Sequence, residues 1–375
     1  MKLEVLQENL SKGLAIASRF VASRPQLPVL TNILFLAEKN NKLRLTATNL
    51  EIGIQYWLGA KVEESGQLTV PAKELTEFIS YLSAGKLALE SKKKTQLEVN
   101  SQSGKAVFSG MNAAEFPKIP VASEDKTVSL PIKSLAEAVN RCSFAAAADD
   151  TRPVLAAIYW QFTANGYRMV ATDGYRLSMK DISGVKLKLN NEKEMFFLIP
   201  ARSLMEVTRL VNLEETIKVG LTKDGNQVIF LLPDWQLSSR LIEGEFPDYQ
   251  KIIPQETKTK ISLEREEFYQ AVKIASVFAR ESANIVKFVL KKGQMIITAN
   301  APSMGENKTE INTKIKGPEL SIAFNYRFIL DFLNAIPDEE EEVILEFNDA
   351  LSPGVFKIAS DPSWLHIIMP VRIDI

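Results

Sequence analysis

The amino-acid sequence predicts an α+β protein made of three copies of one unit, each with two helices packed on an antiparallel sheet. Three observations predict this fold class. A helix-like segment recurs at domain-sized intervals, a strand with a turn follows each copy, and a second helix follows in turn. At 375 residues the chain is also too long for one ordinary hydrophobic core. We therefore expect three successive domains, at residues 1–125, 126–254 and 255–375.

The first helix of each unit has apolar residues at the i, i+3/i+4 and i+7 spacing of an amphipathic helix. The three segments are residues 7–21, 131–145 and 264–279. The first apolar residues of the three helices are Leu10, Leu135 and Phe268. They lie 125 and then 133 positions apart. This period is the size of a domain, so the repeat unit is a domain and not a short solenoid repeat.

A strand followed by a turn comes next in each copy, and then a short strand with a second helix. The strand-and-turn segments are residues 43–52, 167–177 and 295–301, the third being the weakest match. The second helices are expected within residues 70–79, 199–207 and 324–333. Pro71 and Pro200 suit a helix start, because the missing N–H of proline would be unpaired there anyway.

Composition argues against an enzyme and against a metal site. The one cysteine, Cys142, cannot form an internal disulfide, and we expect it in the core. With a single histidine, His366, a zinc site would need mostly carboxylate ligands. A catalytic triad of Ser363, His366 and Asp361 would rest on closeness in sequence alone, and we expect His366 at the surface or capping the last strand. We expect neither catalysis nor a cofactor.

The net charge gives no global attraction to nucleic acid, because the chain has 45 basic and 46 acidic residues. Any DNA binding must therefore depend on where the charges lie. No stretch approaches the roughly 18 consecutive apolar residues of a membrane helix. We expect a cytoplasmic protein with no membrane partner.

Five motifs resemble the bacterial DNA polymerase III beta subunit family, the sliding clamps. Each is weak alone, but the five stand in the family's order and the likeness extends from residue 1 to about residue 373. The motifs are LPVLTNIL at 27–34, VPA at 70–72, ATDGYRLS at 171–178, FPDY at 246–249 and MPVRI at 369–373.

This resemblance implies three DNA-clamp domains per chain and a head-to-tail homodimeric ring around duplex DNA. Such a ring is a non-catalytic processivity factor, which tethers the DNA polymerase III alpha subunit, the clamp loader and other proteins that carry a short linear motif. An alternative is a clamp-fold peptide-binding scaffold, or a specialised second clamp, that does not encircle DNA. The alternative stays open because the expected helices carry an excess of only about four positive charges per chain.

The resemblance implies that the helices line the hole, where phosphate contacts would bind DNA without regard to sequence and permit sliding. The alternative for any one basic residue is a solvated helix face. The predicted DNA-binding residues are Arg24, Arg141, Arg152 and Arg202.

The resemblance also implies a pocket for a partner peptide. The sequence motif of that peptide is a glutamine followed by aliphatic and aromatic residues. Apolar walls would hold the anchors, and a methionine adapts to different partners. By themselves, Asp173-Gly174 could be an ordinary turn and Met369-Pro370-Val371 the end of an edge strand. The predicted pocket residues are Leu155, Thr172, Gly174, Tyr175, Arg176, Leu177, Pro247, Ile252, Asn325, Phe328, Ile367, Met369, Pro370, Val371 and Arg372.

Two features of this chain at or beside the predicted pocket differ from the family pattern. Phe328 stands where relatives commonly have tyrosine, and Asp374 and Ile375 extend beyond the usual end. The preferred partner motif is therefore not determined by the resemblance.

The resemblance places the protomer contact between the first domain of one chain and the third of the other. By position, Ala106, Val107 and Phe108 would meet Val277 and Phe278. The alternative is that Phe108 and Phe278 belong to the internal core, since both lie on apolar stripes.

Overall fold

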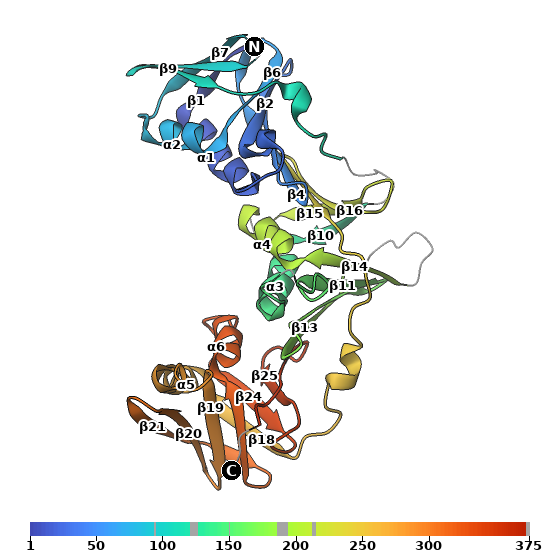
Figure 1. The fold of residues 1–375 in the computed structure, drawn as a ribbon. Helices are drawn as coiled ribbons and strands as arrows, with labels where there is room; N and C mark the ends of the chain where they lie inside the picture. Colours follow the sequence, from blue (N-terminus) through green and yellow to red (C-terminus); the bar gives the residue numbers. More distant parts are fainter. Residues whose placement is uncertain (94, 121–126, 150, 186–193, 212–214, 373–375) are drawn as a thin grey trace. The chain divides into compact units, whose positions relative to one another are not determined.

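The computed structural model divides into two compact units (Figure 1). The first unit combines Met1–Leu130 with Thr216–Leu241, and the second combines Pro131–Glu215 with Ile242–Ile375. The residues that the structure describes are 1–93, 95–120, 127–149, 151–185, 194–211 and 215–372. Among these, none of the helices combines the length and apolar character that a membrane crossing requires.

Three pairs of α-helices recur along the chain, and the members of each pair pack against each other. The pairs are α1 (Gln7–Ala17) with α2 (Ala72–Tyr81), α3 (Ile132–Cys142) with α4 (Ala201–Leu210), and α5 (Arg265–Ala279) with α6 (Tyr326–Asn334). All six predicted helices are confirmed. Two of the first helices end earlier than predicted, because 3₁₀ turns at Ser18–Phe20 and Ser143–Ala145 replace their last turns.

The first unit contains two antiparallel sheets. One has the order β5-β1-β7-β8-β9 and the other the order β10-β15-β16-β17-β4-β3-β2-β6. The strands are β1 (Lys2–Leu6), β2 (Asn32–Glu38), β3 (Lys42–Thr48), β4 (Ile52–Gly59), β5 (Lys61–Glu64), β6 (Gly66–Pro71), β7 (Lys86–Lys93), β8 (Gln96–Ser101), β9 (Gly104–Ser109), β10 (Thr127–Pro131), β15 (Thr216–Leu221), β16 (Gln227–Leu232) and β17 (Trp235–Arg240).

The second unit also contains two antiparallel sheets, with the orders β14-β11-β12-β13-β26-β25-β24-β18-β22 and β21-β20-β19-β23. Its strands are β11 (Ala157–Thr163), β12 (Gly166–Thr172), β13 (Arg176–Ser183), β14 (Glu194–Pro200), β18 (Thr259–Glu264), β19 (Ile285–Lys291), β20 (Gln294–Ala301), β21 (Gly305–Asn312), β22 (Lys314–Lys316), β23 (Leu320–Asn325), β24 (Glu342–Phe347), β25 (Gly354–Ile358) and β26 (Trp364–Ile368).

The three repeats share one strand order. In each, three strands form a meander and the strand before the second helix pairs with the first of them, as in β4-β3-β2-β6, β13-β12-β11-β14 and β21-β20-β19-β23. The strand before the first helix pairs with the strand after the second, as in β1-β7-β8-β9, β10-β15-β16-β17 and β18-β24-β25-β26. The threefold repetition expected from the sequence is confirmed at the level of strand pairing.

Neighbouring repeats are joined through their sheets. β17 of the second repeat pairs with β4 of the first, and β26 of the third repeat pairs with β13 of the second. The equivalent strands that remain are β9 and β21, and each is the last strand of its sheet in the described part of the chain. The same type of strand pairing thus joins the first repeat to the second and the second to the third. The first repeat keeps β9 and the third keeps β21 as the strands that would form a further pairing of this type.

Cys142 lies in the core, as predicted. It is fully buried at the end of α3 and its thiol donates a hydrogen bond to the Met169 carbonyl at 3.4 Å. Burial raises the pKa of this thiol far above its ordinary value, so the thiolate is disfavoured. Cys142 is therefore a packing residue.

Candidate functional site

An apolar cluster lies on one face of the nine-stranded sheet, where β12, β13 and β26 adjoin. Its buried members include Leu177 and Ile367, which are direct cross-strand partners and therefore point to the same face. Tyr249, from the 3₁₀ helix Tyr249–Ile252, packs against them, and Ile252 packs at the margin. Three of the predicted pocket residues, Leu177, Ile252 and Ile367, are thus brought together by segments far apart in sequence.

The turn between β12 and β13 is held by its own side chains. The Asp173 carboxylate accepts hydrogen bonds from the backbone N–H groups of Tyr175 (2.9 Å) and Arg176 (3.0 Å). The Thr172 hydroxyl donates to the Arg176 carbonyl at 2.6 Å and accepts from the Gly174 N–H at 3.1 Å. Gly174 has φ of +93°, a conformation that other residues adopt only with strain. The turn presents the Tyr175 side chain, which is 68% exposed.

Arg176 connects this turn to helix α6. Its guanidinium donates to Asp173 at 3.0 Å and to Asp331 at 2.5 Å, and it lies 4.5 Å from the ring centroid of Phe328. Paired on two sides and stacked on a ring, Arg176 is held against α6, on the face of β13 opposite to its neighbour Leu177. Asp331 was not predicted as a site residue from the sequence. An acidic residue on a helix is usually solvated, and its partner Arg176 is known only from the structure.

The segment after β26 runs along the same edge. The Met369 N–H donates to the Tyr175 carbonyl at 2.8 Å, and the Val371 N–H donates to the Ala323 carbonyl at 2.8 Å. The Met369 side chain, two residues after Ile367, is 36% exposed. A flexible, exposed thioether can adapt to different ligands. Asp374 and Ile375 lie outside the described residues.

The remaining predicted pocket residues have several roles. Asn325 caps α6, because its side-chain oxygen accepts from the Arg327 N–H at 3.0 Å. Leu155 is buried, Pro370 is half-buried, and Pro247 and Arg372 are exposed. Tyr249 was missed from the sequence, although it is the last residue of the FPDY motif and could have been found there.

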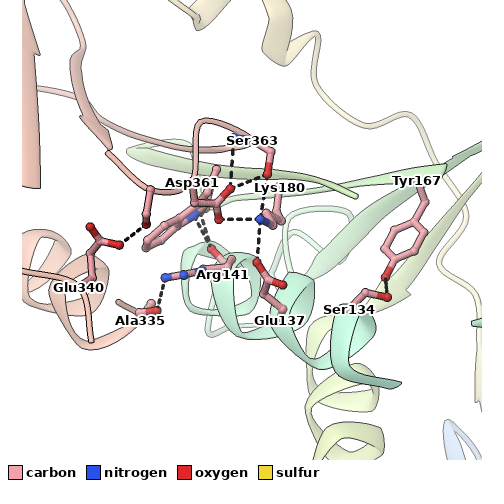
Figure 2. A network of polar contacts seen from close by, with 12 residues as sticks. Ser134, Glu137, Arg141, Tyr167, Lys180, Ala335, Glu340, Asp361 and Ser363 are labelled. Atoms are coloured by element: carbon pink, nitrogen blue, oxygen red, sulfur yellow. Dashed lines mark hydrogen bonds and ion pairs between the residues drawn. The ribbon is translucent and has the colours of Figure 1, made fainter. Parts of the chain in front are cut away.

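The opposite face of the same strands carries a buried polar network (Figure 2). The Lys180 ammonium on β13 donates to Asp361 (2.5 Å) and Ser363 (2.8 Å) and pairs with Glu137 on α3 (2.7 Å). Burial disfavours the charged Asp361 carboxylate, but hydrogen bonds from Lys180 and Ser363 outweigh this effect and hold its pKa below the ordinary value. The network connects α3 and β13 of the second repeat to the loop before β26 in the third.

Arg141 belongs to this buried face, which corrects its predicted role as a DNA-binding residue. It is only 5% exposed, its guanidinium donates to the Ala335 carbonyl at 2.6 Å, and it lies 4.1 Å from the ring centroid of Trp364 (Figure 2). Desolvation by burial lowers its pKa from the ordinary value. A guanidinium so enclosed is not available to a phosphate.

The other three predicted DNA-binding residues are exposed. Arg202 lies in the first turn of α4 and Arg152 in a turn before β11, and the two segments are linked by the Ala201 N–H, which donates to the Ala156 carbonyl at 3.0 Å. Arg24 lies in the loop after the 3₁₀ turn Ser18–Phe20, outside helix α1. These positions leave the three guanidinium groups accessible to a ligand.

The predicted dimer residues lie on two separate surfaces. On β9, Val107 is 54% exposed, while Phe108 packs edge-on against Phe78 with ring centroids 5.3 Å apart. On α5, Val277 is 48% exposed and Ile274, one helical turn away, is 49% exposed. Ala106 is half-buried on β9, and Phe278 packs partly against the core of the second unit. Each surface thus combines an exposed valine with a half-buried phenylalanine.

His366 is not at the surface, contrary to expectation. It is fully buried on β26, with its ring stacked on Phe332 at 5.4 Å and lying 5.1 Å from Phe144. Neither ring nitrogen has a hydrogen-bond partner in the described structure, and burial lowers the pKa of His366 well below 6.5. Ser363 donates instead to Asp361 at 2.6 Å, so the three residues do not form a triad. No cluster of acidic, histidine and cysteine residues suited to a metal is found in the described residues.

Comparison with known proteins gives a likeness over the whole chain. Family models of the DNA polymerase III beta subunit match its N-terminal domain at residues 1–120, its central domain at 129–248 and its C-terminal domain at 250–372. The beta sliding clamp of Synechocystis sp. is 32% identical, with all of both chains covered. That of Staphylococcus epidermidis is 29% identical over 94% of each chain.

Solved structures give the same result for the fold. The DNA polymerase sliding clamp from Bacillus subtilis superposes with a TM-score of 0.92 at 26% identity, with all of both chains covered. The DNA polymerase III beta subunit from Thermotoga maritima gives a TM-score of 0.90 at 30% identity, again over both chains in full. The likeness therefore extends over both units and all three repeats.

Proposed function

Because this chain belongs to the bacterial DNA polymerase III beta subunit family, the sliding clamps, we propose that two copies of it close head to tail into a ring around duplex DNA. The chain has the three-domain clamp fold and is a processivity factor of DNA replication without catalytic activity. We place its domains at residues 1–125, 126–254 and 255–375. The first of these boundaries lies outside the described residues.

The observation that best supports the ring is the repeated sheet joint. β4 with β17 and β13 with β26 are equivalent pairs that join successive repeats. The next pair in the series would be β21 with β9 of a second copy, and both strands are sheet edges in the described structure. A joint that repeats with a fixed rotation either closes into a ring or extends into a filament. Two copies contain six repeats, which is the closed form expected for this family.

The side chains beside these two edges fit such a joint. Val107 and Phe108 stand on β9, while Val277 and Ile274 stand exposed on α5. Exposed apolar groups beside an unpaired strand edge favour association, which would bury both the edge and the apolar surface. We propose Ala106, Val107, Phe108, Val277 and Phe278 as the dimer contacts.

We propose that Arg24, Arg152 and Arg202 contact the DNA backbone, and we leave out the buried Arg141. Phosphate contacts give affinity without sequence preference, which lets a ring slide. Only three arginines are proposed to contact DNA, and this small number suits a ring that stays on DNA because it encircles it. Such a ring needs no tight binding, and weak phosphate contacts leave it free to slide.

We propose that the apolar cluster of Leu177, Ile252 and Ile367, with Met369 at its margin, binds the aliphatic and aromatic residues of partner peptides. The rigid turn at Thr172–Leu177 provides backbone groups, and Arg176 with Asn325 forms the polar side. The partners are the DNA polymerase III alpha subunit, the clamp loader and other proteins with a motif of glutamine, aliphatic and aromatic residues. These interactions would take place in the cytoplasm.

Solution mass and retention on DNA test the ring directly. A dimer should have twice the chain mass of 41.9 kDa, about 84 kDa, by light scattering. Once loaded on a nicked circular plasmid, the dimer should be retained until the plasmid is cut with a restriction enzyme. A monomer, or retention that cutting does not change, would favour the scaffold that binds peptides without encircling DNA.

A further inference from the structure

A second groove lies next to the peptide pocket on the same face of the nine-stranded sheet. It has a volume of about 430 Å³ and is formed by β11, β14 and the segment 244–250. Pro247, a predicted pocket residue, lines this groove as well, and Tyr249 belongs both to the groove and to the Leu177–Ile367 cluster. The two sites therefore lie on either side of one short segment and share its side chains.

The floor of the groove is a stack of three aromatic rings. The Tyr159 ring stacks on Phe246 with centroids 5.2 Å apart and on Phe196 with centroids 5.6 Å apart. Phe196 stands on β14, at the edge of the sheet, and is 62% exposed. Phe196 therefore extends the aromatic surface of Tyr159 and Phe246 to the solvent, where a ligand can reach it.

The rim of the groove is acidic. Glu245 and Asp248 are its charged lining residues, and no lysine or arginine is among the residues that line it. Glu245 makes no ion pair with any described residue. Asp248 pairs with Lys251 at 2.8 Å, but both side chains are more than half exposed, so this pair is weak and readily exchanged.

We propose that this groove binds an arginine side chain of the partner peptide, one that follows the motif held in the adjacent pocket. The inference rests on the proposed peptide pocket and extends it. A guanidinium stacks on aromatic faces and pairs with carboxylates at the same time, which matches a ring stack bordered by two acids. Because the apolar cluster shares Tyr249 with the groove, the proposal puts the aromatic residue of the motif in the cluster and the residues that follow it in the groove.

The test compares three labelled peptides by fluorescence anisotropy, using the full-length protein. The core peptide contains glutamine, aliphatic residues and a terminal phenylalanine. The second adds a glycine spacer and two arginines after the phenylalanine, and the third adds the same spacer and two glutamates. We expect the arginine extension to bind about five- to tenfold more tightly than the core peptide at low salt, with a gain that shrinks as salt is added.

Two surface variants locate the gain. Phe196→Ala and Glu245→Gln should each remove most of the advantage of the arginine extension while leaving core-peptide affinity unchanged. Unchanged core affinity also shows that each variant is folded. The matched control is Tyr81→Ala, which removes an aromatic ring that is 78% exposed on α2, in the other unit. It should leave the gain intact.

The outcomes separate this inference from the proposed function. If the core peptide fails to bind the unaltered protein, the peptide pocket is overturned and the groove proposal with it. If the core peptide binds but the arginine extension adds nothing, or its gain survives Phe196→Ala, only the groove proposal is wrong. An equal gain from the glutamate extension would likewise overturn the cationic ligand.

Discussion

The two faces of strands β13 and β26 differ in what they do. On one face, Leu177 and Ile367 belong to an apolar cluster together with Val170 and Tyr249. On the other, the neighbouring residues Lys180 and His366 are 4% and 0% exposed, within an ionic and aromatic network. Adjacent residues in a strand point to opposite faces, so a single pair of strands carries both the proposed peptide-binding surface and a buried polar network.

The comparison indicates how the peptide pocket keeps its shape. Its two strands come from different repeats and are joined by only one ladder of hydrogen bonds. Beside that ladder, Lys180 pairs with Asp361 of the third repeat, and Arg141 reaches the end of α6. A buried ion pair adds little net stability compared with apolar packing, but we expect this one to restrict the two repeats to one arrangement. We expect the two faces to be separable by mutation.

The largest effect is expected from Asp361→Ala on the supporting face. Lys180 would remain buried with Glu137 as its one ionic partner, and the free energy of unfolding should fall by about 3 kcal/mol. Urea unfolding monitored by circular dichroism measures this loss. Asp338→Ala is the matched control, because Asp338 pairs with Arg265 at 3.4 Å while fully exposed. A loss no larger than that of the control would show that the network does not hold the repeats together.

Met369→Ala on the binding face should weaken peptide binding by about 30-fold, or about 2 kcal/mol, because it removes an adaptable anchor beside the apolar cluster. Stability should change by less than about 0.5 kcal/mol, since the side chain is partly exposed. Isothermal titration with the core peptide gives the affinity. A destabilised protein with unaltered peptide affinity would reverse the assignment of the two faces.

The pH dependence of stability should depend on His366. Its folded pKa is lowered below 6.5, so the unfolded chain takes up the extra proton as the pH falls. Stability is therefore fully present above pH 6.5 and is lost toward acid, by up to about 1.4 kcal/mol per pH unit. In His366→Phe this slope should be absent between pH 6.5 and about 5. Asp361 also loses stabilising ionisation in acid, but at lower pH, because its folded pKa lies below 3.8. An unchanged slope in the variant would show that another group is responsible.

The smallest effect is expected from single charge reversals outside both faces. Arg24→Glu or Arg202→Glu should reduce the slope of log affinity against log salt by about 1, through loss of one phosphate contact. Peptide affinity should not change. Lys218→Glu, an exposed position on strand β15, is the control of equal charge change. Equal DNA retention for all three variants would remove Arg24 and Arg202 from the DNA site.

Much of the fold could be predicted because it is encoded locally. Helices such as Arg265–Ala279 show their buried stripe at helical spacing, and the strands show theirs by alternation. Leu177 was predicted through its motif and Ile367 through the family resemblance, and their common face then follows from the cross-strand register. Side-chain direction within an element needs no knowledge of the rest of the chain.

The errors about Arg141 and His366 concern what a side chain meets from elsewhere in the chain. Arg141 was expected to contact DNA because it is basic and stands on a helix, but its partner carbonyl at Ala335 is 194 residues away. His366 was expected near solvent, yet Phe144 and Phe332 enclose it. Asp331 and Lys180 gained roles through partners on other elements.

The sequence by itself determined the threefold repeat, the helices and strands, and the alternation that separates Leu177 from Ser178 on β13. Only the tertiary structure decided that one face of that strand is closed by α3 and the loop before β26, while the other remains open at Met369. The physical reason is range. Backbone periodicity is a property of a few consecutive residues, whereas burial and pairing depend on which distant segments the fold brings together.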